Sequence, residues 1–98
     1  MELEFADPDL DRLETDASFH AGFADEVVRG YRKALWAMRA ATDLRDLYRG
    51  GLRCEKLQGD RLGQHSVRLN KQWRLVFRIV TDEGGSKARL IEIVDYHK

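Results

Sequence analysis

The sequence predicts a single α+β domain in which helices pack on one face of a small, mainly antiparallel sheet. Apolar residues with three- and four-residue spacing indicate a long helix that ends near residue 40, and strict alternation in 66–69 and 73–79 indicates a strand hairpin. One short strand precedes the helices and further strands follow them, an order that favours helices gathered on one side. The 98 residues suffice for one domain, 1–98.

The N-terminal segment predicts a short strand followed by a short helix. Polar and apolar residues alternate in Glu2–Phe5, which is enough for a first strand. Asp7 can cap a helix that has Pro8 at its first position, and Leu10 and Leu13 supply the apolar side of that helix.

A long helix is expected from about His20 to Ala40. Its apolar residues form one stripe, which we expect to face the core. The stripe consists of Phe19, Phe23, Val27, Tyr31, Leu35 and Met38. Trp36 lies off the stripe, so it either covers the edge of the core or stays exposed as a contact for a partner.

Three shorter elements are expected between the long helix and the hairpin. Thr42 is the predicted cap of a third helix over 43–48, and the glycine pair at 50–51 ends it. A strand is then expected over 52–57, followed by a loop over 58–63.

The register of the hairpin follows from its buried face. A two-residue loop would mix polar and apolar residues on each face, whereas a three-residue loop over 70–72 gives one apolar face. The expected pairs on that face are Leu69 with Trp73, Val67 with Leu75, and His65 with Phe77. Asn70 or Lys71 is expected to supply any positive φ that the loop needs.

The same register makes Arg68 and Arg74 direct cross-strand neighbours, with Arg78 further along the same polar face. Like charges placed opposite each other are unfavourable by ~0.2–1 kcal/mol, so this face suggests a site for an anion. Alternatively, the arginine stems cover the sheet while their charged heads stay in water. Either way, we expect Arg74 to be a surface residue whose removal leaves no cavity.

The last strand is expected from residue 87 or 88 to residue 96, with a centre apolar enough for an interior strand. If Ile91 and Ile93 face the core, the residues that face the arginines are Glu92, Val94 and Tyr96. Glu92 would then partly neutralise the arginines. Strict alternation points His97 the other way unless the chain leaves strand geometry, and spacing does not decide between the two.

The net charge of zero conceals a strong asymmetry. Residues 1–28 carry nine acids and one base, whereas residues 29–78 carry thirteen bases and four acids. This polarity favours a basic surface for nucleic acid. Pairing of the two segments within the fold is the alternative.

Composition excludes several classes of protein. The sequence has no apolar run of membrane-spanning length and no secretory signal, so we expect a cytoplasmic protein without a membrane partner. A single cysteine, Cys54, rules out an internal disulfide, and we expect it to be a small buried residue. Histidine, cysteine and acidic residues show no metal-ligand spacing, so neither a metal nor another cofactor is expected.

Several motifs of the C-terminal half occur together in the pattern of one known family. They are Ala41-Thr42-Asp43-Leu44-Arg45-Asp46-Leu47, Gly59-Asp60-Arg61, Gly63-Gln64-His65-Ser66-Val67-Arg68, Asn70, Gln72-Trp73-Arg74 and Glu92-Ile93-Val94-Asp95-Tyr96-His97. With these motifs the chain resembles the HigB branch of the RelE-type toxins over about residues 41–97. The first forty residues agree in element order more than in letters, and 47–51 lacks the prolines that related chains often carry.

The resemblance implies a RelE-like fold and the toxin of a type II toxin–antitoxin system. Such toxins are metal-independent endoribonucleases that cut messenger RNA in the ribosomal A site. The implied partners are the ribosome, mRNA and a HigA-like helix-turn-helix antitoxin, with operator DNA bound only through the antitoxin complex. Two alternatives stay open. One is a relative that inhibits a protein target such as gyrase, although such relatives lack this arginine and histidine set. The other is a non-catalytic RNA-binding or repressor module.

The resemblance also implies which residues act on RNA. Attack of a ribose 2′-hydroxyl on the adjacent phosphate needs cationic donors and groups that transfer protons. Arg74 matches the catalytic arginine of the family, and His97 is the natural proton-transfer group near neutral pH. Asp95 is expected to orient His97, and Tyr96 to stack on a base or share in proton transfer. Further RNA contacts are expected from Arg68, Lys56, His65 and Arg78.

Overall fold

One sheet organises the computed structural model, which describes residues 1–96. Its strands are β1 (Glu2–Phe5), β2 (Glu55–Lys56), β3 (His65–Arg68), β4 (Trp73–Asp82) and β5 (Gly85–Asp95). The spatial order is β1-β5-β4-β3-β2, and every pairing is antiparallel except that of β1 with β5. The predicted α+β fold class with a mainly antiparallel sheet is confirmed.

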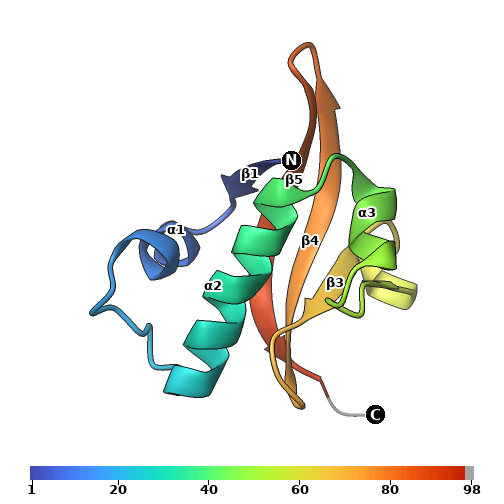
Figure 1. Cartoon of the computed structure of the whole chain (residues 1–98). Coiled ribbons are helices and arrows are strands. Elements are labelled where there is room, and N and C mark those ends of the chain that lie inside the picture. The colour runs from blue at the N-terminus through green and yellow to red at the C-terminus, as the bar shows by residue number, and fades with distance from the viewer. Residues whose placement is uncertain (97–98) are drawn as a thin grey trace.

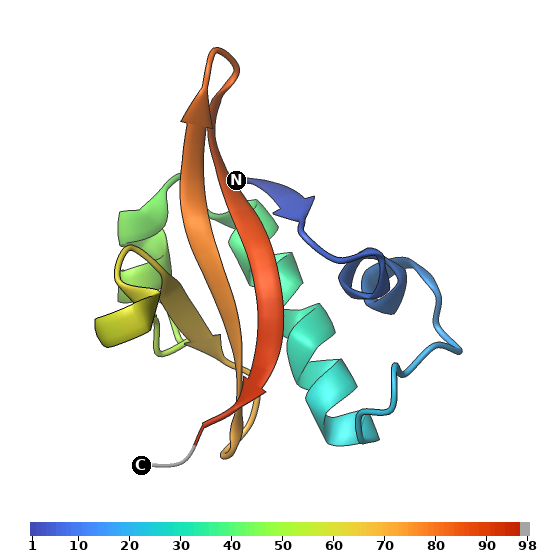
Figure 2. The same cartoon turned by 180° about the vertical axis from the view of Figure 1, so that it is seen from behind.

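Three helices, α1 (Pro8–Thr15), α2 (Asp25–Ala40) and α3 (Leu44–Arg49), lie on one face of this sheet. Figure 1 shows α2 running along the sheet, with α1 on one side of it and α3 on the other. Figure 2 shows the opposite face without these helices, with the segment around the 3₁₀ turn η1 (Gly59–Arg61) lying beside β3. We call the two sides the helix face and the open face.

Asp7 caps α1 with its carboxylate, as predicted. Helix α2 holds α1 in place through two polar side chains. On α2, the buried hydroxyl of Tyr31 donates to the carbonyl of Leu10 at 2.6 Å, and Nε of Arg32 donates to the carbonyl of Leu13 at 2.9 Å. Arg32 therefore satisfies a carbonyl in the last turn of α1 that has no partner within the helix.

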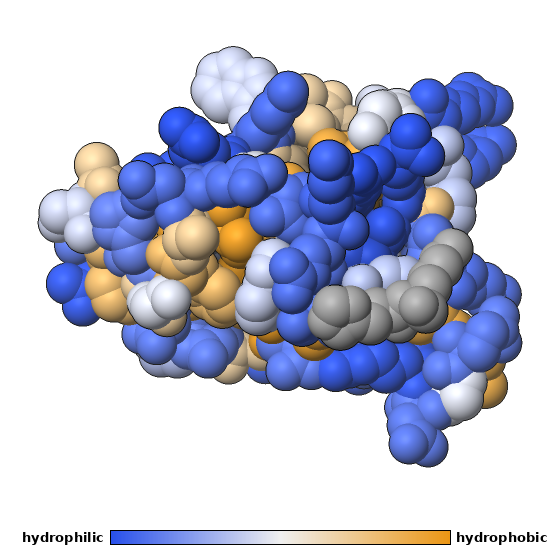
Figure 3. Space-filling model, turned by 90° about the horizontal axis from the view of Figure 1, so that it is seen from below, coloured by the Kyte–Doolittle hydropathy of each residue, from blue (hydrophilic) through white to orange (hydrophobic). Residues whose placement is uncertain are grey.

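Helix α2 begins at Asp25, so its predicted start near His20 is wrong. Ala21 and Gly22 have φ values of 50° and 83°, and this left-handed turn is incompatible with a helix that runs through it. The segment 16–24 is an irregular connection instead. Seen from below, apolar atoms gather on the side where this connection lies, and the rest of that view is mostly hydrophilic (Figure 3).

Phe19 and Phe23 consequently lie outside the helical stripe to which they were assigned, although both pack against the core. The remaining stripe residues, from Val27 to Met38, are buried as predicted. Trp36 is 80% exposed on the solvent side of α2. It does not cover the edge of the core, and the interpretation of Trp36 as an exposed aromatic is correct.

The elements between α2 and the hairpin differ in detail from the prediction. Asp43, not Thr42, caps α3, since its carboxylate accepts a hydrogen bond from the backbone nitrogen of Asp46 at 3.3 Å. Strand β2 has two residues instead of the predicted strand over 52–57. Arg53 has a φ of 50°, which interrupts extended geometry just before β2.

The hairpin of β3 and β4 has the predicted register. Val67 pairs with Leu75, His65 pairs with Phe77, and the backbone nitrogen of Leu69 donates to the carbonyl of Trp73 at 2.9 Å. The loop needs no positive φ, since neither Asn70 nor Lys71 adopts one. The side chain of Asn70 closes the loop instead, accepting from the backbone nitrogens of Gln72 at 2.9 Å and Trp73 at 2.7 Å.

The core fills the space between α2 and the sheet. Its fully buried side chains include Tyr31, Leu35, Met38, Leu75, Phe77 and Leu90. A bulge shifts the β4–β5 register, so that Val76 pairs with Glu92 and Phe77 pairs with Leu90. Ile91 is therefore an extra residue, and Leu90 joins Ile93 at the core instead of the predicted Ile91.

Gly30 lets α2 approach the end of β3 closely. A Cβ atom at this position would lie 2.2 Å from the carbonyl oxygen of Leu69. Only glycine fits here while both backbones keep their places. The position of α2 on the sheet therefore depends on residue 30 having no side chain.

We expect Gly30→Ala to lower the free energy of unfolding by about 1–3 kcal/mol, the range for overpacking a core. This loss exceeds the gain of up to about 1 kcal/mol from the higher helix propensity of alanine. Urea unfolding followed by circular dichroism measures the effect. Gly51→Ala is the control, since nothing lies within 4 Å of its added Cβ. Equal stability of the two variants would contradict the close approach.

Candidate functional site

The open face carries a pocket of about 300 Å³ near the C-terminal end of β5. Its walls come from β3, β4, β5, the segment around η1 and the residue after β5. The lining residues are Leu57, Arg61, Ser66, Val76, Val94, Asp95 and Tyr96. Ser66 and Val76 are buried, so the pocket has a covered floor. We call it the sheet pocket.

Arg74 lies buried beside the sheet pocket and is only 6% exposed. Its Nε donates to the hydroxyl of Ser66 at 2.7 Å, and its Nη2 donates to the carbonyls of Ser66, at 3.3 Å, and of Arg53. The expectation of a surface arginine whose loss leaves no cavity is therefore wrong. The reason is that the segment before β2 reaches the open face and supplies a backbone acceptor for the guanidinium.

Tyr96 and Asp95 are brought to Arg74, as the sequence predicts. The Arg74 guanidinium lies over the Tyr96 ring, 5.4 Å from its centroid. The hairpin loop fixes both residues, because the carbonyl of Gln72 accepts from the Tyr96 nitrogen at 2.7 Å and the Gln72 amide donates to Asp95 at 2.9 Å. The last two described residues are thus held at the pocket.

A second arginine, Arg61, also lines the pocket, although it is not among the site residues predicted from the sequence. Its Nη2 donates to the carboxylate of Glu92, which projects from β5. Glu92 therefore neutralises an arginine, as expected, but its partner is Arg61. The only signal for Arg61 was its place in the Gly59-Asp60-Arg61 motif.

Arg68 and Arg78 do not join Arg74 at the pocket. The Cα register pairs Arg68 with Arg74, as predicted, but Nε of Arg68 donates to the carbonyl of Asn70 at 3.0 Å. Its side chain lines a different hollow, next to α2. Arg78 is exposed further along β4, where its register partner is Arg89. The guanidinium groups of Arg68 and Arg78 therefore do not cluster with that of Arg74, contrary to the expectation.

Lys56 and His65 lie on the helix face, because they pair with each other and His65 pairs with Phe77 of the core. The pairing of His65 with Phe77 is as predicted, and it places both side chains on the face opposite Arg74. His65 stacks on Phe77 at 5.5 Å, and its Nδ1 lies 2.9 Å from the hydroxyl of Tyr48. Burial, followed by the charge of Lys56, lowers the pKa of His65 below its ordinary value.

His97 lies outside the described residues, so its predicted role remains a prediction. Within residues 1–96, no group of three or more histidine, cysteine or acidic side chains could hold a metal ion. No helix in this described part is long and apolar enough to cross a membrane. Burial raises the pKa of the Cys54 thiol to about 11, which makes it a neutral, partly buried side chain at pH 7.

The sheet pocket combines positive charge with an aromatic ring and carboxylates. Guanidinium groups bind phosphate oxygens through charge-assisted hydrogen bonds, and a tyrosine ring can stack on an unpaired base. Arg61 and Tyr96 lie on its walls, while Arg74 adds charge from its buried position. This arrangement suits a ligand that carries both a phosphate and a planar ring.

Comparison with protein families gives one match across almost the whole chain. A family model described as a RelE-like toxin of the type II toxin–antitoxin system HigB matches residues 3–97. No match to a curated protein was found.

Solved structures share the fold at low sequence identity. A YoeB/ParE toxin from Agrobacterium tumefaciens aligns with a TM-score of 0.65 and 20% identity, over 99% of this chain and 100% of its own. The YoeB–YefM complex from Staphylococcus aureus gives a TM-score of 0.59 and 19% identity, over 100% of this chain and 98% of its own. The YoeB dimer from the same species gives 0.54 and 20%, with the same coverage. These likenesses establish the RelE-like fold.

We expect Arg74→Ala to lower the free energy of unfolding by about 2–4 kcal/mol, because it leaves a void and removes the donor from the buried Ser66 hydroxyl. Urea unfolding monitored by circular dichroism tests this. Arg78→Ala, on the same strand and face but exposed, should stay within about 0.5 kcal/mol of the parent. If Arg74→Ala is as stable as Arg78→Ala, the buried hydrogen bonds contribute nothing.

The lowered pKa of His65 predicts a specific pH dependence. The unfolded chain takes up a proton on this histidine near its ordinary value of 6.5, while the folded chain stays neutral to lower pH. The contribution of neutral His65 to the free energy of unfolding is therefore fully present above pH 6.5, and it is lost as the pH falls through the lower pKa of the folded state. Between about pH 8 and pH 5, the parent should lose more unfolding free energy than His65→Phe does. Parallel stability curves would show that the fold leaves this pKa unchanged.

Proposed function

This chain belongs to the HigB-like family of RelE-like toxins from type II toxin–antitoxin systems, and we propose that it is a ribosome-dependent endoribonuclease that cuts mRNA in the A site. The proposed setting is the cytoplasm, where ribosomes are found. The observation that carries the proposal is the sheet pocket at the end of β5, which Arg61 and Tyr96 line and beside which Arg74 lies under the Tyr96 ring. His97 follows Tyr96 directly in the sequence.

In the proposed reaction, a ribose 2′-hydroxyl attacks the adjacent phosphate and the 5′-oxygen leaves. Negative charge grows on the phosphate oxygens, so guanidinium groups next to the pocket lower the barrier. Protons must leave the 2′-oxygen and reach the 5′-oxygen, which needs two groups that exchange protons. We assign His97 as the main proton-transfer group, with Asp95 orienting it and Tyr96 stacking on a base or sharing the transfer.

The burial of Arg74 gives it two proposed tasks. Nε and Nη2 are engaged with Ser66 and Arg53, which fixes the plane of the guanidinium beneath Tyr96. Nη1 has no hydrogen bond to residues 1–96, and no fully buried side-chain nitrogen in that range lacks a partner, so Nη1 reaches solvent. We propose that Nη1 contacts the phosphate while the rest of the group holds the pocket together.

Arg61 would be the second cation at the phosphate. Its ion pair with Glu92 is partly exposed, so RNA phosphate can compete with the carboxylate for the guanidinium. Arg68 and Arg78 would contact RNA outside the pocket, along the flanking chain.

The proposed protein partner is a helix-turn-helix antitoxin of the HigA type, with operator DNA bound only by the complex. The family match supports an antitoxin, as does the likeness to YoeB of Staphylococcus aureus, which is solved in complex with YefM. The ribosome and mRNA would be the partners of the free toxin.

Induced alone, the chain should stop translation and growth, and a translating ribosome should be needed for cleavage of a defined message by purified protein. His97→Ala should slow single-turnover cleavage by about 10²–10⁴-fold, the usual contribution of a positioned acid or base. Ribosome binding should change little, because the arginines remain.

His20→Ala is the matched control and should cleave at the parental rate, since His20 pairs with Asp25 at the start of α2. Unimpaired growth at confirmed soluble expression would contradict the toxin assignment. Growth arrest without any RNA cleavage would instead point to a protein target. If His97→Ala cleaves as fast as the parent, the proton moves through another group.

A further inference from the structure

The segment that joins β2 to β3 has a single inward-facing side chain, and this side chain lines the sheet pocket. Residues 58–63, which we call the η1 loop, are all exposed except Arg61. Leu62 is the one apolar side chain of the loop and is 71% exposed. The loop therefore has no apolar anchor, and its position depends on Arg61.

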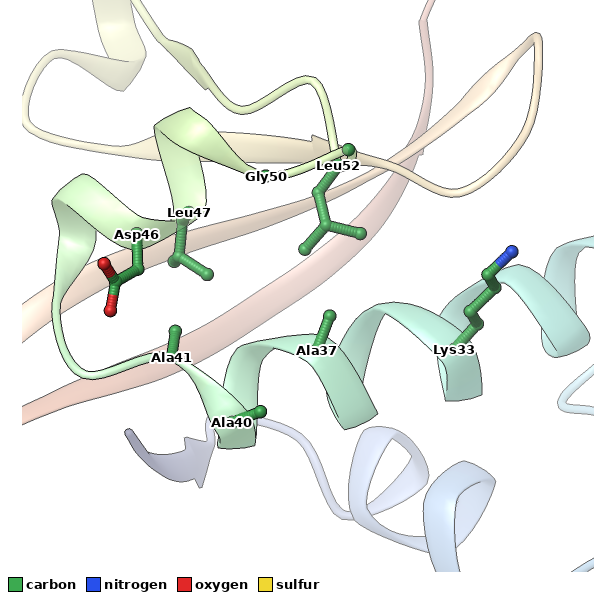
Figure 4. A pocket seen from close by; sticks show the side chains of 9 residues that line it. Lys33, Ala37, Ala40, Ala41, Asp46, Leu47, Gly50 and Leu52 are labelled. Carbon is green, nitrogen blue, oxygen red and sulfur yellow. The ribbon is translucent and has the colours of Figure 1, made fainter.

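The preceding segment, which joins α3 to β2, is held in a different way. Figure 4 shows Leu47 and Leu52 pointing toward α2, with Ala37 and Ala41 opposite them. Leu47 is buried and Leu52 packs against the core, so apolar contacts fix this segment. The η1 loop has no counterpart to these two leucines.

The η1 loop carries glycine hinges close to both of its ends. The backbone nitrogen of Leu57 donates to the carbonyl of Gln64 at 3.0 Å, which closes the neck of the loop. Gly59 and Gly63 have φ values of 64° and 89°, and nothing lies within 4 Å of a Cβ built at either position. Glycine changes φ at little steric cost, so the part of the loop between these hinges can swing as one unit.

The side chain of Arg61 crosses the floor of the sheet pocket to reach β5. Ser66, Val76 and Glu92 lie side by side in the register of β3, β4 and β5. The η1 loop lies beside β3 (Figure 2), yet Nη2 of Arg61 donates to the carboxylate of Glu92. Its Nη1 donates to the side chain of Gln64 at 3.1 Å. The guanidinium therefore spans the row above the buried Ser66 and Val76.

In the free protein this ion pair opposes the arrival of RNA. Two of the three guanidinium nitrogens of Arg61 are engaged, with Glu92 and Gln64, so they are not available to a phosphate. The carboxylate of Glu92 also places negative charge beside the pocket, where it repels phosphate. A phosphate that replaces Glu92 on Arg61 removes both obstacles at once.

We propose that the ion pair of Arg61 and Glu92 is an autoinhibitory strap, which holds the η1 loop over the sheet pocket until an RNA phosphate replaces the carboxylate. The two side chains are 37% and 48% exposed, and ion pairs of this kind change an equilibrium by at most about fivefold. The strap is thus weak enough for a substrate to release. This inference rests on the proposed function, because that function supplies the RNA.

Limited digestion with trypsin measures the strap in the absence of RNA. Glu92→Gln should speed cutting after Arg61 by about two- to fivefold, because proteolysis follows the population of the open loop. Cutting after Arg49 is the internal reference, since Arg49 forms no ion pair with an acid of residues 1–96. Its rate should stay at the parental value, which shows that the variant has not loosened the whole fold.

Cleavage of a defined message on ribosomes measures the effect of the strap on the substrate. Glu92→Gln should lower KM by about two- to fivefold and leave kcat unchanged, because the strap is already open in the bound state. Glu55→Gln is the matched control, since it removes the same charge from the same row of the open face. Glu55 lies opposite Ser66 and forms no ion pair with a cation of residues 1–96, so this variant should keep the parental KM.

The outcomes separate the strap from the proposed function. A parent chain that cleaves RNA, with parental cutting after Arg61 in Glu92→Gln, overturns the strap alone. Equal falls in KM for Glu92→Gln and Glu55→Gln also overturn it, because negative charge near the pocket then explains the effect. Faster cutting after Arg61 with an unchanged KM shows a closed loop that does not inhibit, and it overturns the autoinhibition. A parent chain that cleaves no RNA, while Glu92→Gln is cut faster after Arg61, overturns the function and leaves the closed loop standing.

Discussion

The sheet pocket depends on the buried guanidinium of Arg74. Its donors reach a hydroxyl on β3 and a carbonyl before β2, and it lies over the ring of Tyr96, which follows β5. One side chain therefore joins three stretches that are far apart in the sequence. A buried charge is unfavourable unless its hydrogen bonds are made, so these acceptors stay in place whenever the chain is folded. The pocket is consequently formed before any ligand arrives.

The charge asymmetry of the sequence is only partly cancelled within the fold. Arg39 of the basic centre pairs with Glu14 of the acidic beginning, and Arg89 of the last strand pairs with Glu4. Such partly exposed pairs contribute at most about 1 kcal/mol each, so their main effect is to cancel charge on that side. Arg29, Arg68, Lys71 and Arg78 form no ion pair with an acid of residues 1–96, so the surplus positive charge is spread over several surfaces.

Local patterns in the sequence predict the fold class and the hairpin register, because alternation determines which side chains share a face. Alternation does not say what covers that face, and for this reason the burial of Arg74 was missed. The start of α2 was misplaced since Phe19 and Phe23 keep helical spacing across a left-handed turn. The resemblance selects Arg74, Asp95 and Tyr96 together with His65 and Lys56, and of these Asp95 and Tyr96 lie at the pocket beside Arg74, whereas His65 and Lys56 lie on the helix face. Which carboxylate meets Arg61 depends on tertiary packing that no local pattern encodes.

The carbonyl that holds Arg74 has a consequence for how toxins of this kind diverge. Leu52 and Arg53 line a hollow beside α2, and the backbone carbonyl of Arg53 also anchors the buried guanidinium. A substitution that shifts the backbone of this short segment would therefore also shift Arg74 on the far side of the sheet, so the segment evolves under two structural demands at once.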